Sequence, residues 1–126
     1  MILIFGGAYQ GKLGYALDRF QLTEIDVCRC DCDNANLLEG KKLFYEIDKW
    51  VLAMVKMDVD VEESLRRFID ANPDAIVICS DISCGVVPTD PILRKWREAA
   101  GKSLAMLSRN SNEIIRLFCG IPARIV

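Results

Sequence analysis

The sequence predicts an α/β domain of three layers, in which helices cover both faces of a mainly parallel β-sheet. Residues 2–5 and 75–79 are two runs that are apolar throughout, as expected for parallel strands buried on both faces. Amphipathic stretches separate such runs, and strands alternating with helices form right-handed crossovers around a parallel sheet. The chain has 126 residues, of which 52% are hydrophobic, so residues 1–126 are expected to form a single domain.

The first half of the chain is expected to contain two strands and two helices. Residues 2–5 form the first strand, residues 11–20 a short helix, and residues 25–30 the second strand. A long amphipathic helix is predicted over residues 36–57, because apolar side chains recur there every three or four positions. This stripe is interpreted as a core face rather than a groove for a partner; it consists of Phe44, Ile47, Trp50, Val51, Met54 and Val55.

The second half is expected to contain two helices and two strands. Asp60 is placed to cap a helix that ends before Pro73, with Glu63 positioned to reach back to the cap. Residues 75–79 form the next strand, and a helix then opens at Thr89-Asp90-Pro91, with proline tolerated in the first turn. Residues 113–119 form the last strand, which Gly120-Ile121-Pro122 ends. The apolar residues expected to face inward are Leu65, Phe68 and Ile69 in the first helix and Ile92, Leu93, Trp96, Leu104 and Leu107 in the second.

A glycine-rich loop follows the first predicted strand and nearly fits the phosphate-binding pattern G-x-x-x-x-G-K-[ST]. Gly6, Gly11 and Lys12 are in register, and Leu13 stands where the hydroxyl residue belongs. Backbone N–H groups of such a loop surround phosphate oxygens, and the lysine adds a positive charge. The predicted nucleotide-binding residues are therefore Gly6, Gly7, Ala8, Tyr9, Gln10, Gly11, Lys12 and Leu13.

A second loop, residues 80–88, follows the other apolar run and begins with Ser80-Asp81. An apolar strand that ends in aspartate is the Walker B arrangement, whose carboxylate holds Mg²⁺ or orients the attacking group. The two loops are expected at the same edge of the sheet, where ligands bind in open α/β folds. Lys12 and Asp81 are thus the predicted catalytic pair, and the alternative is that Asp81 merely caps a turn.

Magnesium is the predicted cofactor, with Asp81 as its protein ligand. The serine or threonine hydroxyl of this motif normally ligates Mg²⁺, and Leu13 has no such group. Losing one ligand weakens the predicted metal site without abolishing it, because nucleotide phosphates supply oxygens as well.

A dinucleotide-binding fingerprint is the main alternative for the first loop. Gly7, Gly11 and Gly14 are loosely spaced glycines after a strand, and Glu24 or Asp26 follows downstream. The loop lacks the middle glycine of G-x-G-x-x-G, and that pattern gives the lysine no role. The mononucleotide interpretation is therefore preferred.

Three alternate cysteines, Cys28, Cys30 and Cys32, share one face if they lie on an extended strand. A metal site would need a fourth ligand, and the chain contains no histidine. The C-x-C-x-C spacing also differs from the C-x₂-C spacing of common zinc sites. Reduced cysteines acting as small hydrophobic residues are the preferred interpretation, with a metal or redox role as the alternative.

Charge and hydropathy exclude several classes of partner. The net charge of −2 and the lack of a basic cluster argue against nucleic acid and against a membrane surface. The apolar residues 1–5 are too few for a signal peptide or a membrane span. A cytoplasmic protein is expected.

Four motifs resemble those of the adenosylcobinamide kinase / adenosylcobinamide-phosphate guanylyltransferase family (CobU family). Residues 6–12 are similar to its opening G-G-x-R-S-G-K-S, and residues 81–88, D-I-S-C-G-V-V-P, are similar to its E-V-G-x-G-[IV]-V-P. Residues 94–101, R-K-W-R-E-A-A-G, are similar to R-R-F-R-D-x-x-G, and residues 119–122, C-G-I-P, to the closing S-G-[IL]-P. The resemblance covers residues 1–16 and 75–126 and fades between them, so the chain is identified as a shortened, divergent member.

The resemblance implies a RecA-like P-loop fold and a place in cobalamin biosynthesis. The family phosphorylates the aminopropanol arm of adenosylcobinamide with GTP or ATP and then transfers GMP through a histidine-bound intermediate. The resemblance implies that residues 6–12 bind nucleotide phosphates and that Asp81 takes the place of the family's glutamate. The resemblance also implies a homo-oligomer, a corrinoid partner, and a substrate loop that comprises Ser83, Cys84, Gly85, Val86 and Pro88.

The departures from the family pattern divide the possible functions. The chain contains no histidine, so guanylyl transfer through a histidine-bound intermediate is not possible. The glycine-rich loop and Lys12, which a kinase needs to bind phosphates, are present. Kinase-type phosphoryl transfer is therefore the leading hypothesis. The alternative is a catalytically lapsed relative that binds nucleotide or corrinoid as a regulator or partner subunit.

Overall fold

A computed structural model describes residues 1–7, 11–80 and 90–125 of the chain. Its centre is a six-stranded sheet in the order β2-β3-β4-β1-β5-β6, in which the pair β5–β6 is antiparallel and the other pairs are parallel. The predicted α/β fold with a mainly parallel sheet is confirmed. The strands are β1 (Ile2–Gly6), β2 (Val27–Arg29), β3 (Leu43–Tyr45), β4 (Ile76–Ser80), β5 (Glu113–Phe118) and β6 (Ile121–Arg124).

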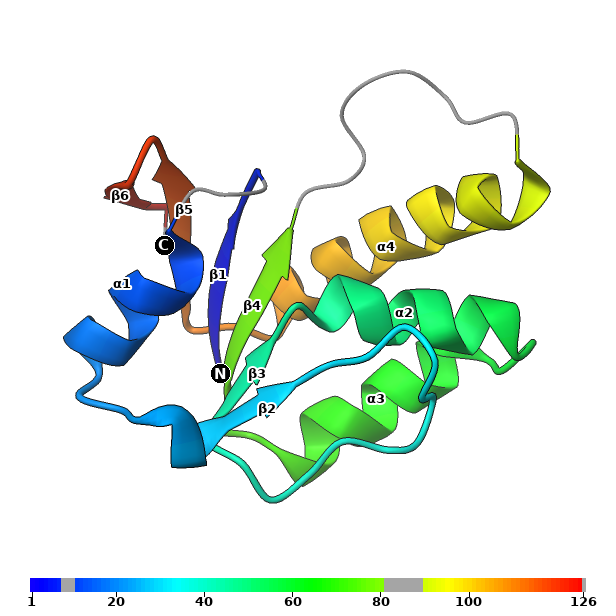
Figure 1. Cartoon of the computed structure of the whole chain (residues 1–126), viewed down its shortest axis with the longest axis horizontal. Helices are drawn as coiled ribbons and strands as arrows, with labels where there is room; N and C mark the ends of the chain where they lie inside the picture. Colours follow the sequence, from blue (N-terminus) through cyan, green and yellow to red (C-terminus); the bar gives the residue numbers. More distant parts are fainter. Residues whose placement is uncertain (8–10, 81–89, 126) are drawn as a thin grey trace.

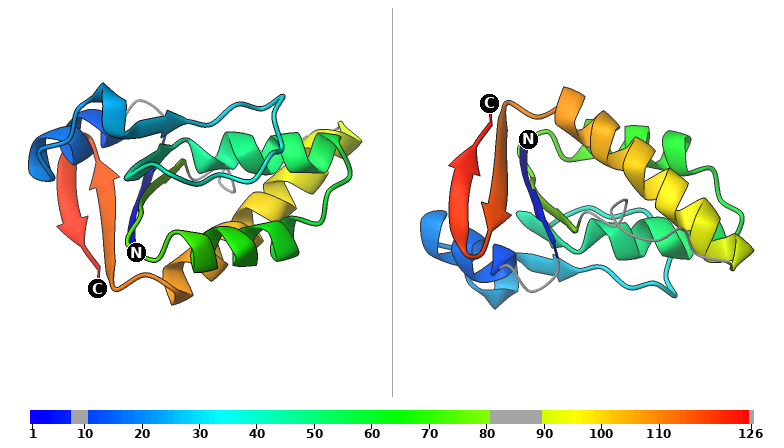
Figure 2. Two further views of the ribbon diagram at one scale, coloured as in Figure 1. Left: turned by 90° about the horizontal axis from the view of Figure 1, so that it is seen from below. Right: turned by 90° about the horizontal axis from the view of Figure 1, so that it is seen from above.

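Helices cover both faces of this sheet, as the three-layer prediction requires. The helix α1 (Lys12–Arg19) lies on one face, and α2 (Ile47–Lys56), α3 (Val61–Ala71) and α4 (Pro91–Arg109) lie on the other (Figures 1 and 2). A short 3₁₀ helix (Glu24–Asp26) leads into β2. None of the described helices is long and apolar enough to cross a membrane.

Two apolar clusters fill the spaces between the layers. Successive residues of β1 point to opposite faces, so Leu3 packs with the cluster under α2, α3 and α4, whereas Ile4 packs with the cluster under α1. In β4, Val77 packs with the cluster under α2, α3 and α4, and Ile78 packs with the cluster under α1. This double burial explains why both strands are apolar throughout.

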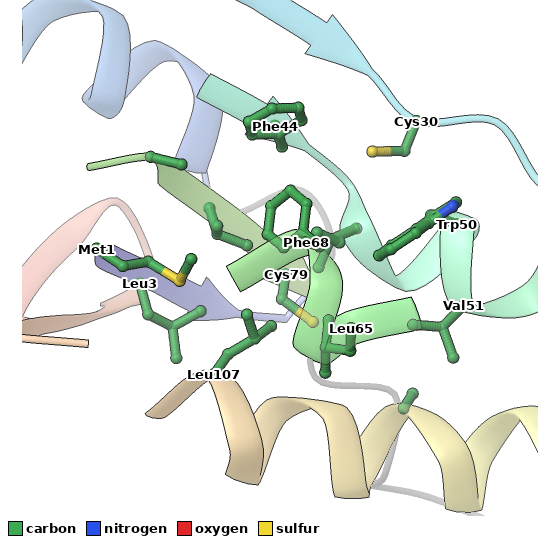
Figure 3. Close-up of a cluster of buried hydrophobic side chains, with 14 of the residues drawn as sticks. Met1, Leu3, Cys30, Phe44, Trp50, Val51, Leu65, Phe68, Cys79 and Leu107 are labelled. Atoms are coloured by element: carbon green, nitrogen blue, oxygen red, sulfur yellow. The ribbon is translucent and has the colours of Figure 1, made fainter. Parts of the chain in front are cut away.

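Aromatic contacts join α2, α3 and the sheet in the larger cluster. The Phe68 ring of α3 meets the Phe44 ring of β3 edge-on at 4.9 Å and the Trp50 ring of α2 at 5.6 Å (Figure 3). All three side chains are fully buried. The stripe predicted as a core face is therefore core, although it is divided between a strand and a helix.

The prediction of one helix over residues 36–57 is wrong in its first half. Leu43–Tyr45 form β3, which pairs with β2 and β4, and α2 begins only at Ile47. The apolar residues Leu43 and Phe44 fit a helical stripe as well as a strand, and strand pairing decides between them.

Two expectations for the second half of the chain are also wrong. Residues 113–119 were predicted to form the last strand, but Ile121–Arg124 return as a further strand, the antiparallel edge strand β6. Ile92 and Leu93 do not face inward; they are 39% and 38% exposed, in the first turn of α4 before Trp96 reaches the core. The predicted strand 25–30 is shorter than expected, because the 3₁₀ helix takes its first residues.

The predicted helix caps are largely as expected. The Asp60 carboxylate accepts a hydrogen bond from the Glu63 N–H at 3.1 Å, and the Asp90 carboxylate accepts from the Ile92 N–H at 2.8 Å. Glu63 does not reach back to Asp60; its carboxylate pairs with Arg66 and Arg67 one turn further along α3. Thr89 lies outside the described residues.

Candidate functional site

The candidate site lies at the edge of the sheet where the parallel strands β3, β4 and β1 end. Gly6, the last residue of β1, is paired with Ser80, the last residue of β4, and β3 ends on the far side of β4 at Tyr45. The residues that follow these strands therefore meet at one edge, as ligand sites in open α/β sheets do.

Gly6 is required by the close approach of β5. A Cβ atom built at Gly6 would lie 2.5 Å from the Leu117 carbonyl oxygen, which belongs to the backbone and cannot rotate away. No side chain fits there unless the two strands separate. The glycine thus lets β1 remain in the middle of the sheet up to the point where the loop leaves it.

Gly11 sets the start of α1 in a different way. It is the N-cap residue and has a left-handed backbone with φ of 77°, and no atom of the described residues lies within 4 Å of a Cβ built at this position. Its constraint is therefore conformational rather than steric, since residues with a side chain rarely adopt this backbone.

Lys12 is the first residue of α1, and its side chain is directed back toward Gly7. The residue is only 6% exposed, and its Nζ donates a hydrogen bond of 2.6 Å to the Gly7 carbonyl oxygen. Burial lowers the pKa of the Lys12 ammonium below its ordinary value, and the nearby charge of Asp48 opposes this shift. The lysine is thus held close to the start of the loop.

Asp48, in the first turn of α2, is a buried carboxylate at the same edge. It is 6% exposed, and its Oδ1 accepts a hydrogen bond of 3.1 Å from the Ser80 N–H at the end of β4. Burial raises the pKa of its carboxyl group, while that hydrogen bond and the charge of Lys12 act in the opposite direction. The Trp96 ring N–H of α4 donates to the Asp48 carbonyl oxygen at 2.8 Å, which ties this turn to α4.

Glu46, the residue between β3 and α2, has a strained backbone. Its φ is 60°, in the left-handed region that residues other than glycine seldom occupy. Its carboxylate pairs with Lys49, and its charge also acts on Asp48 and Lys12. Such strain persists only where the surroundings fix it, and it is common at ligand sites.

The sequence did not lead us to Asp48 or Glu46, because both fall inside the long helix that was predicted over residues 36–57. Once β3 is recognised, the sequence Leu43-Phe44-Tyr45-Glu46 is an apolar strand followed by an acid, like the strand before Asp81. That pattern was the available signal for these two residues.

Some of the other predicted site residues lie in the described part of the chain, and the rest lie outside it. Leu13, in the first turn of α1, is half-buried, and its side chain packs against the apolar cluster under that helix. Gly7 is exposed, and its carbonyl oxygen accepts a hydrogen bond from Lys12 Nζ. The remaining predictions, which are Ala8, Tyr9, Gln10, Asp81, Ser83, Cys84, Gly85, Val86 and Pro88, lie outside the described residues.

The residues of the dinucleotide alternative have other partners, away from this edge. The Glu24 carboxylate pairs with Arg29 at 3.0 Å, and the Asp26 carboxylate accepts from the Thr23 N–H in a capping box. Both residues precede β2 and so lie at its amino end. This arrangement favours the mononucleotide interpretation.

The three alternate cysteines, Cys28, Cys30 and Cys32, form no disulfide. Cys30 is buried in the larger apolar cluster, and burial raises the pKa of its thiol. Within the described ranges, the one group of three or more residues with metal-ligand spacing is Asp31, Cys32 and Asp33. The thiols of Cys28 and Cys30 interact with each other, but Cys32 does not join them in such a group.

Comparison with known proteins identifies the family. The family model for cobinamide kinase / cobinamide phosphate guanyltransferase (CobU) matches residues 32–125, well over half of the chain. The chain belongs to the CobU family. Membership places it among nucleotide-binding proteins of cobalamin biosynthesis with the RecA-like P-loop fold, and the family's substrates are nucleotides and corrinoids. No curated protein matches the chain.

The matched residues include β3, α2 and α3, the middle region where the resemblance to the family was weakest. They do not include β1 and α1. The assignment of phosphate binding to Gly6 and Lys12 therefore depends on the loop motif and on its geometry, and not on the family match.

The carboxylates at the site have the chemistry that Mg²⁺ requires. Divalent magnesium prefers oxygen ligands and is usually held by one or two carboxylates together with substrate phosphates. Asp48 supplies a buried carboxylate beside Lys12, and Glu46 a second one that is partly exposed. Asp48 is the better candidate because its position is fixed by Ser80.

Gly6→Ala is expected to destabilise the protein by about 1–3 kcal/mol, because the new methyl group must displace the β5 backbone. Gly11→Ala, which meets no atom, should cost about 1 kcal/mol through its left-handed backbone alone. Urea unfolding of both variants measures the difference. Equal losses at the two positions would show that the approach of Leu117 does not constrain Gly6.

Asp48→Asn is expected to change how stability depends on pH. Because the folded Asp48 has a raised pKa, the wild-type fold loses stability as pH rises from about 3.8, the ordinary value, through the folded pKa. Asparagine keeps an acceptor for Ser80 but does not titrate, so this loss should vanish from the variant. The test is the difference in unfolding free energy between the wild type and the variant, measured from pH 3 to 8. A difference that does not change with pH would contradict a raised pKa for Asp48.

Proposed function

We propose that the chain binds the phosphates of GTP or ATP at residues 6–13 and transfers the γ-phosphoryl group to a hydroxyl group of a cobinamide-type corrinoid. The observation that carries the proposal is the buried Lys12 ammonium at the amino end of α1, beside the buried carboxylate of Asp48. Family membership supports nucleotide and corrinoid as the substrate classes.

The chemistry of Lys12 favours phosphate as its ligand. An ammonium group has three N–H donors, and within the described part of the chain Lys12 makes one hydrogen bond, to the Gly7 carbonyl oxygen. The remaining donors are available to phosphate oxygens. The amino end of α1 adds backbone N–H groups and a positive dipole end, and a bound anion would relieve the burial of the lysine charge.

In the proposed step, the corrinoid hydroxyl oxygen attacks the γ-phosphorus, and the bond between that phosphorus and the bridging oxygen to the β-phosphate breaks. The nucleoside diphosphate leaves, and the hydroxyl proton passes to a carboxylate. Lys12 stabilises the charge that develops on the phosphate oxygens. Asp81 is the carboxylate predicted from the sequence to orient the attacking hydroxyl group and accept its proton.

When bound, Mg²⁺ would neutralise phosphate charge, and Asp48 is the residue we propose to hold it. Leu13 offers no ligand, so the metal would depend more on the carboxylates than in a chain with a hydroxyl at this position. Guanylyl transfer through a histidine is not proposed, because the chain contains no histidine.

A second candidate function is binding without turnover, as a nucleotide- or corrinoid-binding regulator or partner subunit. The observation that favours it is the position of Leu13, which contributes to the apolar cluster where the motif has a metal ligand. Nucleotide affinity that does not respond to Mg²⁺, with no phosphorylated corrinoid formed, would support this function over the kinase.

Lys12→Ala is expected to weaken GTP and ATP binding at least tenfold, which corresponds to about 1.4 kcal/mol for the lost charge-assisted contact. Titration calorimetry of both nucleotides, with and without Mg²⁺, measures this. Lys42→Ala is the matched control, because Lys42 is an exposed lysine at the other end of β3 and should not affect affinity. Wild-type protein that binds neither nucleotide would refute the proposal; if it binds, cobinamide phosphorylation is assayed next.

Leu13→Ser is expected to increase the Mg²⁺-dependent part of nucleotide affinity several-fold, because it supplies the absent hydroxyl ligand. The same change removes a half-buried side chain and should lower stability by about 1–2 kcal/mol. Leu13→Ala is the matched control, since it loses the packing without gaining a ligand. If both variants respond to Mg²⁺ like the wild type, no metal reaches this position.

A further inference from the structure

Two cysteines at the end of β2 have thiols in contact, and neither takes part in the proposed function. Cys28 and Cys30 are alternate residues of an extended segment, so their side chains lie on the same face of the sheet. Cys30 is a buried member of the apolar cluster under α2, α3 and α4, and Cys28 packs against that cluster half-buried. Figure 3 shows the Cys30 sulfur directed into the cluster. A hydrogen bond joins the two thiols.

The spacing of these two residues permits a disulfide but strains it. Residues two positions apart on a strand have Cα atoms about 6.6 Å apart, near the upper end of the range of about 4.4–6.8 Å that a disulfide spans. The backbone between them must therefore bend when the sulfurs move from a hydrogen bond to a covalent bond. A ring closed over one intervening residue gains little from loop entropy, so strain decides its stability. Strained disulfides are readily reduced, which suits a reversible modification.

The two thiols differ in how they can react. Cys28 is partly exposed, so it is the more accessible of the two. Cys30 is 8% exposed, and burial together with the hydrogen bond to Cys28 raises the pKa of its thiol. Because this hydrogen bond favours the protonated form of Cys30, the Cys30 S–H is the donor and the Cys28 sulfur the acceptor. Cys28 is therefore the thiol that meets a reagent from solution, and Cys30 the one that resolves the product.

We propose that Cys28 and Cys30 form a reversible intramolecular disulfide by exchange with a low-molecular-weight disulfide, for which glutathione disulfide is the probe. The Cys28 sulfur loses its proton and attacks one sulfur of the probe; the S–S bond of the probe breaks, and one glutathione leaves and takes up a proton. The Cys30 sulfur then loses its proton and attacks the Cys28 sulfur of the mixed disulfide, and the second glutathione leaves as a thiol. Two protein thiols are oxidised, and one glutathione disulfide is reduced to two thiols.

The disulfide acts on the acidic part of the candidate site through β3. The Cys30 N–H donates to the Tyr45 carbonyl oxygen at 3.0 Å, and the next residue is Glu46, whose backbone is left-handed. The charges of Asp48 and Glu46 act on Cys30, so the thiol lies near both carboxylates. Drawing Cys30 toward Cys28 therefore loosens the end of the β2–β3 pairing and the acidic turn that follows it. The disulfide forms whether or not the site binds a nucleotide, so it is independent of the proposed function.

The test treats the reduced full chain with glutathione disulfide and blocks the remaining thiols with iodoacetamide in denaturant. The oxidised cysteines are then reduced and labelled with N-ethylmaleimide. Trypsin cleaves after Arg29, between the two cysteines, so peptides 20–29 and 30–41 report each label by mass spectrometry. The second label should appear on Cys28 and Cys30 in equal amounts. A digest made before reduction should show no glutathione on either peptide.

Cys32→Ser is the matched control, because it removes the next alternate thiol and leaves the contact between Cys28 and Cys30 intact; this variant should oxidise like the wild type. Cys28→Ser should leave Cys30 unoxidised, and it retains the buried thiol of the core. In the oxidised wild type, the amide hydrogens of residues 43–48 should exchange at least tenfold faster than in the reduced chain, with treated Cys28→Ser as the baseline.

Three results would overturn the proposal. The first is glutathione that remains attached to Cys28, because Cys30 would then not resolve the mixed disulfide. The second is a Cys28 disulfide that is lost in Cys32→Ser, which would assign the bond to Cys32. The third is an oxidised chain whose residues 43–48 exchange no faster than those of the reduced chain, because the bond would then not reach the acidic turn.

Discussion

The candidate site depends on the position of β1 at the centre of the sheet. This strand is paired along its whole length with β4 on one side and β5 on the other, and both of its faces are covered by apolar clusters. A strand without a free edge or face can contact solvent only at its ends. At its carboxyl end the Leu117 carbonyl oxygen leaves no room for a side chain, so glycine is required where the loop begins. The loop then reaches α1 on one face of the sheet, while α2 begins on the other.

This arrangement brings two buried charges of opposite sign to one edge. Burial lowers the pKa of Lys12 and raises the pKa of Asp48, so each charged group destabilises the protein when no ligand is bound. Each charge also offsets part of the burial cost of the other. Lys12 and Asp48, both among the described residues, do not form an ion pair with each other, but the charge of each acts on the pKa of the other. A bound phosphate would compensate the lysine, and a bound cation the carboxylate. The same burial that weakens the fold thus prepares the site for a charged ligand.

The parts of the fold that follow from local sequence were predictable. Residues 2–5 and 75–79 are apolar because those strands are buried on both faces, and Asp60 and Asp90 cap their helices through contacts within one turn. The strand β3 was not predictable in this way, because it has three residues whose apolar pattern also fits a helix, and pairing with β2 and β4 decides its conformation. Since Glu46 and Asp48 follow β3, the same ambiguity concealed the acidic part of the site.

Leu13 separates the proposed phosphate binding from the proposed metal binding, because it lacks the hydroxyl ligand of the motif. The helix α1 has only eight residues, too few to be stable without tertiary packing, and Leu13 packs with Ala16 in the cluster that holds it on the sheet. A hydroxyl residue would give up part of that packing to gain a metal ligand. Lys12 and the backbone groups at the amino end of α1 do not depend on this choice. The proposed anion site therefore does not require the hydroxyl group that Leu13 lacks, and a metal in the proposed site would be held by carboxylates such as Asp48.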